Sequence, residues 1–157
     1  MTQPVDILPA LLLPGGLFRL EAADFCAWPG YALLRPVSGV DSPAGFSPEE
    51  AAALGPTLSR VVAALEAATG AERVYLLAFA EVDRRFHLHL LPRTRGLAQA
   101  WAAAAGADPA SPVDGPALFS WVRAACVTED RLPPGTPARA AVWRALTEAL
   151  GVSRGER

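Results

Sequence analysis

Residues 84–93 read RRFHLHLLPR and hold both histidines of the chain, His87 and His89. Successive side chains of a β-strand point to opposite faces, so the odd-numbered residues here share one face and the even-numbered residues the other. The polar odd-numbered residues are Arg85, His87, His89 and Arg93, and the even-numbered ones include Phe86, Leu88 and Leu90. The segment predicts a strand with an apolar face on a core and a cationic face, with two imidazoles, that suits an anion.

Composition narrows the class of protein. A chain of 157 residues, 52% of them hydrophobic, is long enough for one domain with a substantial core. Its net charge of −2 is not the charge of a protein that coats nucleic acid. We therefore expect a globular domain with no nucleic-acid partner.

The cysteines and the first residues indicate the compartment. Cys26 and Cys126 form no CxxC pair. They are interpreted as buried thiols of a reducing cytoplasm, with a disulfide as the alternative. The apolar start carries Asp6 and several prolines and lacks a basic segment, so it is a poor signal peptide and too short to cross a membrane. We expect a cytoplasmic protein, not bound to membranes, whose first residues pack on the domain or on a partner subunit.

Residues 1–95 predict strands around one long helix. Strands are expected at 17–22, 31–37 and 74–82 and in the histidine segment, and the short polar link at 81–84 favours an antiparallel pair. Ser47 and Glu50 form a capping box with Pro48 at the first helical position, and Gly70 marks the end of that helix. The Gly-Pro pair at 55–56 predicts a kink or a restart within it.

The C-terminal third predicts helices. We expect one at 97–105, one at 116–126, and a last one opened by Thr136 and Pro137 that ends at Gly151. The predicted fold class is α+β, with an antiparallel sheet, one long helix and C-terminal helices. The predicted organisation is a core of residues 1–95 with a helical extension of residues 96–157 packed on it.

The segments GYALLRP (30–36), SPEE (47–50) and HLHLLPR (87–93), in this order, resemble the histidine triad (HIT) superfamily. The resemblance covers roughly residues 17–95 and implies a nucleotide-binding core. The family signature has three histidines at alternate positions, followed by two apolar residues and often Pro-Arg. Registered on the Pro-Arg end, His87 is the middle histidine and His89 the third, and Arg85 replaces the first.

The resemblance also implies a reaction. In the family the middle histidine attacks the α-phosphorus of a nucleotide, and water or another acceptor resolves the nucleotidyl-histidine. His87 would be this nucleophile, and His89 would hydrogen-bond the phosphate or the leaving group. The implied activity is that of a nucleotide hydrolase or transferase acting on dinucleoside polyphosphates or nucleoside phosphoramidates, without a cofactor or resident metal. The family commonly forms homodimers that extend the sheet.

The departures from the signature leave alternatives. Arg85 either clamps phosphate, blocks the pocket, or pairs with Glu81 or Asp83. These two carboxylates stand where family members often carry Gln or Asn and Ser or Thr, and either could serve as a general base. We predict Arg85, Arg93 and Glu81 as substrate-binding residues. The alternative is a catalytically impaired HIT-fold nucleotide-binding or regulatory module; a weaker one is a metal site of both histidines with Glu81 or Asp83.

Overall fold

The structure is a computed structural model that describes residues 7–152. It contains the five-stranded antiparallel sheet β1 (Leu11–Leu12), β2 (Phe18–Ala22), β3 (Ala32–Pro36), β4 (Arg73–Leu77) and β5 (Leu88–Arg93), in the order β1-β2-β3-β5-β4. The helices are α1 (Pro48–Thr69), α2 (Arg95–Ala105), α3 (Gly115–Ala125) and α4 (Arg139–Ala149), with short 3-10 turns at Pro43–Gly45 and Glu129–Arg131. The predicted α+β class is confirmed.

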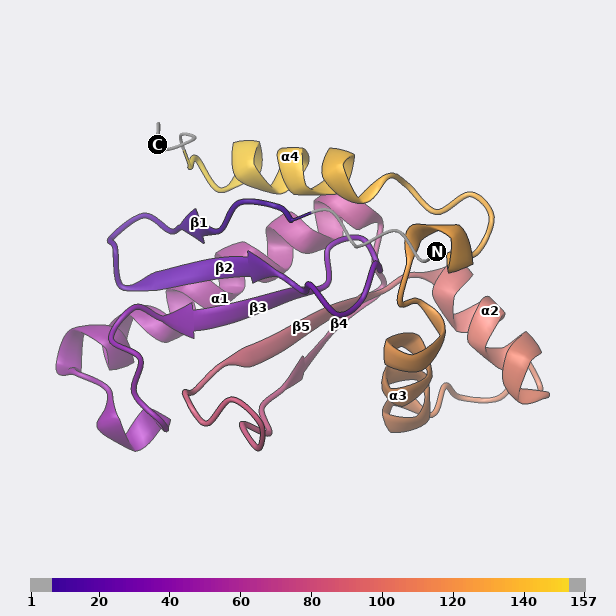
Figure 1. The fold of residues 1–157 in the computed structure, drawn as a ribbon, viewed down its shortest axis with the longest axis horizontal. Coiled ribbons are helices and arrows are strands. Elements are labelled where there is room, and N and C mark those ends of the chain that lie inside the picture. Colours follow the sequence, from indigo (N-terminus) through magenta and orange to yellow (C-terminus); the bar gives the residue numbers. More distant parts are fainter. Residues whose placement is uncertain (1–6, 153–157) are drawn as a thin grey trace.

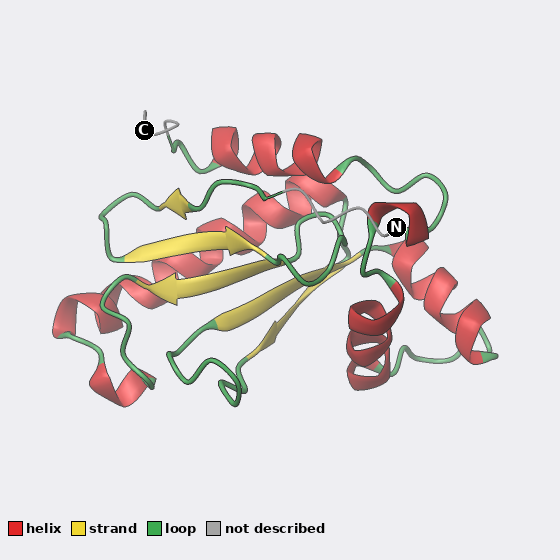
Figure 2. Cartoon of the chain, in the orientation of Figure 1, coloured by secondary structure: helices red, strands yellow, loops and turns green. Residues whose placement is uncertain are grey.

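The helices lie in two groups around the sheet. Figure 1 shows α1 running behind the strands with α4 alongside it, and these two helices contact each other. Helices α2 and α3 lie together at one end of the sheet, as the colouring by secondary structure in Figure 2 makes plain. The β5 strand leads directly into α2, and Thr94 caps that helix by accepting a hydrogen bond from the Leu97 amide.

The predicted boundaries of α1 are confirmed. The Ser47 hydroxyl accepts from the Glu50 amide, the Glu50 carboxylate accepts from the Ser47 amide, and Gly70 closes the helix at φ 68°. Of the two alternatives for residues 55–56, a kink or a restart, the restart is wrong, because α1 continues through Pro56. Pro56 cannot donate to the carbonyl of Ala52, but both residues are exposed, so water can satisfy that oxygen.

Two other boundaries differ from the sequence prediction. Strand β4 ends at Leu77 and β5 begins at Leu88, so the link between them is longer than the predicted 81–84. Phe79 and Val82 continued the apolar strand pattern, but they are 59% and 101% exposed and lie in this link. The Phe86 amide, which would otherwise join the ladder, donates instead to the carbonyl of Val40.

The last helix begins later than predicted. Helix α4 starts at Arg139, with Ala138 at the N-cap and no side-chain cap. Thr136 does not cap this helix, because its hydroxyl and its amide both donate to the carbonyl of Pro133 in a preceding turn.

Two Cys thiols, Cys26 and Cys126, are buried, and they form no disulfide. Across the described residues, no helix has the length and apolar character needed to cross a bilayer.

The main core lies between the sheet and the pair α1 and α4. Strand residues on this face are apolar, and they pack against apolar side chains of both helices. The buried members are Leu11, Leu13, Phe18, Leu20, Ala32, Leu34, Val61, Ala64, Leu65, Leu90, Val142, Trp143, Leu146 and Leu150. Leu11 and Leu13 belong to the predicted N-terminal arm, which therefore packs on the domain through these two residues, while Ile7 is exposed and residues 1–6 lie outside the described part.

Candidate functional site

The two histidines lie on the face of the sheet opposite to the main core. His89 of β5 is paired with Leu33 of β3 on one side and with Leu77 of β4 on the other, so it occupies the middle of the sheet. His87 directly precedes β5, and its ring centroid is 4.9 Å from that of His89. Their exposed fractions are only 6% and 7%. The HxH spacing therefore brings the two imidazoles together, as predicted.

A backbone carbonyl fixes the tautomer of His87. Its Nδ1 lies 2.9 Å from the carbonyl oxygen of Arg85. Because a carbonyl can only accept, Nδ1 must carry the proton, and the neutral ring then has its lone pair on Nε2. Residue 85 thus contributes its main chain to the site, and this contact does not depend on the Arg85 side chain.

His89 is enclosed by aromatic rings from three separate segments. Its Nδ1 lies 2.9 Å from the hydroxyl of Tyr31, and its ring centroid lies 6.2 Å from Phe25 and 6.0 Å from Phe119 of α3. Burial, followed by the charges of His87, Arg123 and Arg35, lowers the pKa of His89 to about 4. At neutral pH this imidazole is therefore an uncharged hydrogen-bonding group.

A chain of ion pairs lies on the same face of the sheet. Glu21 of β2 bridges Arg19 and Arg35, and Asp83 bridges Arg35 and Arg85, with N–O distances of 2.7–2.9 Å. The Arg85 guanidinium forks onto both oxygens of Asp83, and this pairing holds the pKa of the carboxyl well below its usual range. Of the predicted alternatives for Arg85, the structure shows the pair with Asp83.

The structure separates two other predicted residues from the histidines. Arg93 lies six residues beyond His87, which corresponds to roughly 20 Å along a strand. Its guanidinium pairs with Glu72, which also binds Arg95. Glu81 is exposed in the link between β4 and β5. Among the described residues, no hydrogen bond or ion pair joins Arg93 or Glu81 to either histidine.

Sequence reasoning missed several residues of this cluster. Tyr31 and Arg35 share the histidine face because each lies two residues from Leu33, the cross-strand partner of His89. That alternation is visible in the sequence, although the pairing register that brings Tyr31 to His89 is not. Phe119 lies more than 25 residues away in α3, and no local pattern could have linked it to the site.

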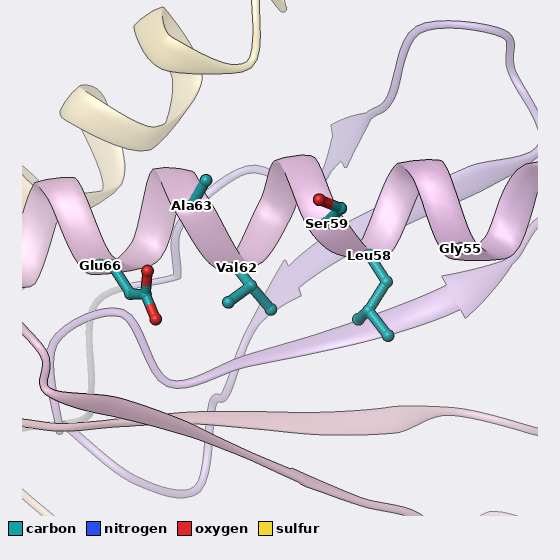
Figure 3. A pocket seen from close by; sticks show the side chains of 6 residues that line it. All are labelled: Gly55, Leu58, Ser59, Val62, Ala63 and Glu66. Carbon is teal, nitrogen blue, oxygen red and sulfur yellow. The ribbon is translucent and has the colours of Figure 1, made fainter.

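Two surface hollows lie elsewhere. One, of about 460 Å³, is a shallow depression on α1 between Gly55 and Glu66, where Leu58 and Val62 point the same way (Figure 3). Because α1 packs on the main core, this depression is on the other side of the sheet from the histidines. The second, of about 360 Å³, lies between the Trp28–Pro29 turn, the start of α2 and residues 133–137.

The metal alternative lacks further ligands. Within residues 7–152, no group of three or more His, Cys, Asp or Glu side chains could hold a metal ion.

Comparison with known proteins identifies the fold. No protein-family model and no curated protein matches the sequence. Among solved structures, similarity is found to a hypothetical histidine triad nucleotide-binding protein from Sulfolobus tokodaii strain 7 (12% identity, 92% of this chain and 85% of that chain, TM-score 0.56). A histidine triad protein from Bradyrhizobium japonicum is also similar (20% identity, 96% and 88%, TM-score 0.50).

A histidine triad protein from Sinorhizobium meliloti 1021 matches at 26% identity over 60% of this chain, with a TM-score of 0.46. That match spans 65% of the S. meliloti protein, less than two thirds of its length. The two matches with higher TM-scores extend over 92% and 96% of this chain. The chain therefore has the fold of histidine triad proteins.

Proposed function

We propose that this protein is a HIT-type nucleotide hydrolase or transferase with His87 as its nucleophile. The observation that carries the proposal is the hydrogen bond from His87 Nδ1 to the Arg85 carbonyl, which leaves the Nε2 lone pair available. This arrangement gives a neutral imidazole the tautomer that nucleophilic attack requires. The S. tokodaii protein of the same fold is described as nucleotide-binding, which supports a nucleotide ligand.

The proposed reaction has two steps. His87 Nε2 forms a bond to the α-phosphorus of a dinucleoside polyphosphate or a nucleoside phosphoramidate, while the bond from that phosphorus to the leaving group breaks. Water or another acceptor then attacks the same phosphorus and breaks its bond to Nε2, which restores the enzyme. His89, uncharged at neutral pH, would donate or accept a hydrogen bond through Nε2 at the phosphate or the leaving group.

Turnover of a small substrate panel tests this proposal. The panel holds diadenosine polyphosphates, an adenosine phosphoramidate and an ADP-sugar, and it compares the native protein with His87→Ala. We expect the native protein to release a mononucleotide and His87→Ala to lose at least roughly 100-fold in kcat, because the covalent route is closed. Retained turnover in His87→Ala would remove the covalent mechanism.

Arg85→Ala separates the side chain of Arg85 from its backbone. We propose that the guanidinium, whose side chain is 59% exposed, binds a substrate phosphate in exchange for Asp83. In that case Arg85→Ala raises KM but keeps kcat, because the carbonyl that orients His87 is still present. A fall in kcat as large as that of His87→Ala would show that the side chain is needed for the chemistry itself. Glu81 and Arg93 stay predictions as substrate contacts, and the pairing of Arg93 with Glu72 argues against the second of these.

A second candidate function is that of a nucleotide-binding or regulatory module without turnover. The observation in its favour is the enclosure of His89 by Tyr31, Phe25 and Phe119, which leaves little of the imidazole exposed. Here residues 96–157, as an extension of the 1–95 core, would cover the site and bind a partner. Nucleotide binding by calorimetry with no product release would support this module over the enzyme.

We also propose a homodimer in which β4 pairs with its counterpart in a second copy. β4 is an edge strand, and Leu76 on it is 46% exposed. An open edge of this kind can extend a sheet across two chains. Light scattering during gel filtration should give twice the 16.5 kDa chain mass, and Leu76→Lys should halve it. A native monomer would contradict this part of the proposal.

A further inference from the structure

Arg123 of α3 lies beside the histidine cluster. Its guanidinium carbon is 5.1 Å from the ring centroid of Phe25 and 5.6 Å from that of Phe119. The same two rings lie 6.2 and 6.0 Å from His89. The guanidinium and the imidazole therefore contact one pair of phenylalanines, although they come from segments more than 30 residues apart.

Arg123 differs from the other arginines around the site in its pairing. Arg19, Arg35 and Arg85 share the carboxylates of Glu21 and Asp83. Arg123 is exposed, and it makes no hydrogen bond and no ion pair within the described residues. Its contacts are with the rings of Phe25 and Phe119. A full positive charge at this edge of the cluster is therefore left for a ligand.

The contact with phenylalanine keeps the donors of Arg123 available. The guanidinium carbon lies 5.1 and 5.6 Å from the two ring centroids, and an aromatic ring attracts a cation without offering the oxygen acceptors that a guanidinium prefers. Its five N–H groups lie in the plane of the guanidinium and remain free for a planar, two-pronged contact with phosphate. The rings thus hold Arg123 in position without satisfying its hydrogen bonds.

The positive charge of Arg123 also affects the pKa values of two groups in the histidine cluster. The charge of Arg123 helps to lower the pKa of His89, after the larger effects of burial and of His87. It also acts against the rise that burial causes in the pKa of Tyr31. The charge of Arg123 therefore acts on both His89 and Tyr31. Because these two groups are neutral at pH 7, they do not offset the positive charge of Arg123.

We propose that Arg123 binds a phosphate beyond the α-phosphate of the nucleotide, so that the site selects ligands with at least two phosphates. The inference rests on the proposed function, because it takes the α-phosphate to lie at His87. The ring of His87 contacts that of His89, His89 contacts Phe25 and Phe119, and these two rings contact Arg123, so we take Arg123 to meet the next phosphate along the ligand. This favours dinucleoside polyphosphates over phosphoramidates as the substrate class.

The test is a set of binding measurements by calorimetry in phosphate-free, magnesium-free buffer. The mono- and diphosphates of adenosine, guanosine, cytidine and uridine are titrated into the native protein, and the base bound most tightly is carried forward. The variants are Arg123→Ala, Arg123→Lys, and Arg144→Ala as the matched control. Arg144 is an exposed helical arginine of α4, on the other side of the sheet.

We expect Arg123→Ala to weaken diphosphate binding by roughly 10- to 100-fold, the range for losing a hydrogen bond between charged groups, and to change monophosphate binding less than threefold. Arg123→Lys should lie between the two, and Arg144→Ala should change neither. A general loss of structure would weaken both ligands equally, so the ratio of the two affinities reports on Arg123 itself.

Two results would overturn the inference. If the native protein binds nucleotides and Arg123→Ala keeps the same diphosphate-to-monophosphate ratio, Arg123 does not contact the second phosphate, while the proposed function stands. If the native protein binds none of the eight nucleotides, the proposed function fails and the inference fails with it.

Discussion

The two faces of the sheet are built in different ways. Beneath α1 and α4 the strand residues are apolar, as Leu34 and Leu90 illustrate, and their contacts need only shape and volume. On the other face, His89 has a phenol as its partner and Arg35 has two carboxylates. A polar group on this face is tied to particular partners. The difference teaches that the first face stabilises the fold and that the second one fixes the positions of reactive groups.

The largest effect should come from the apolar face. Leu90 is fully buried, and its neighbour in β5, His89, points to the opposite face. Leu90→Ala should lower the free energy of unfolding by about 2–5 kcal/mol, the sum of lost burial and of the cavity left behind. Urea denaturation at pH 7 measures this change in the free energy of unfolding. Leu88→Ala, on the same face but only half-buried, is the control and should cost less.

The pH dependence of stability should come from the histidine face. The pKa of His89 is about 4 in the folded protein and about 6.5 when unfolded, so the unfolded chain binds more protons between these values. Stability should therefore be complete above pH 6.5 and fall, as the pH decreases to 4, by at most about 3 kcal/mol.

Denaturation midpoints at pH 7, 6, 5 and 4.5 check this expectation, with His89→Gln as the control. The glutamine variant cannot titrate and should show a nearly flat profile over this window. Asp83 and Glu72, whose pKa values are lowered by their arginine partners, lose their contribution only at lower pH, as they become protonated. An equal slope in His89→Gln would assign the pH dependence to another group.

The two faces also differ in how far the sequence predicts them. The caps of α1 and the apolar face of β5 are local patterns, and the structure confirms them. The strand predicted over 74–82 ends at Leu77. Phe79 and Val82 continue the apolar pattern in the sequence, but both are exposed in the structure and pack on no core. The spacing of apolar residues along the sequence does not by itself show whether each of them packs against a core.

The histidine site was predictable only in part. The HxH spacing places His87 and His89 together on one face. Their surroundings depend on the pairing of β3 with β5 and on the docking of α3. Phe119 and Arg123 reach the site through that docking, and it depends on contacts between distant residues.

A smaller effect is expected from the contact between Tyr31 and His89. Tyr31→Phe removes the hydroxyl that lies 2.9 Å from His89 Nδ1 and leaves a buried nitrogen without its partner. The cost should be about 1–2 kcal/mol of folding free energy. Nitrogen NMR of the two imidazoles should show a change at His89 and little at His87.

Tyr75→Phe is the matched control for Tyr31→Phe. Tyr75 of β4 also packs on the histidine face, but among the described residues its hydroxyl makes no hydrogen bond. Its removal should change neither stability nor the imidazole signals appreciably. If both variants lost the same stability, the Tyr31 hydroxyl would contribute only through packing, and the claim that polar groups on this face are fixed by specific partners would weaken.

The smallest effect is expected at the far end of the histidine face. The side chain of Arg93 is 14% exposed and pairs with that of Glu72, which is 39% exposed, roughly 20 Å along the strand from His87, and ion pairs that reach the solvent in this way stabilise little. Arg93→Ala should therefore leave nucleotide affinity and turnover unchanged and move the denaturation midpoint slightly, with Arg73→Ala as an exposed control on β4. Loss of nucleotide binding in Arg93→Ala alone would mean that the ligand extends along the whole face, and the polar region that holds it would then include this end of β5.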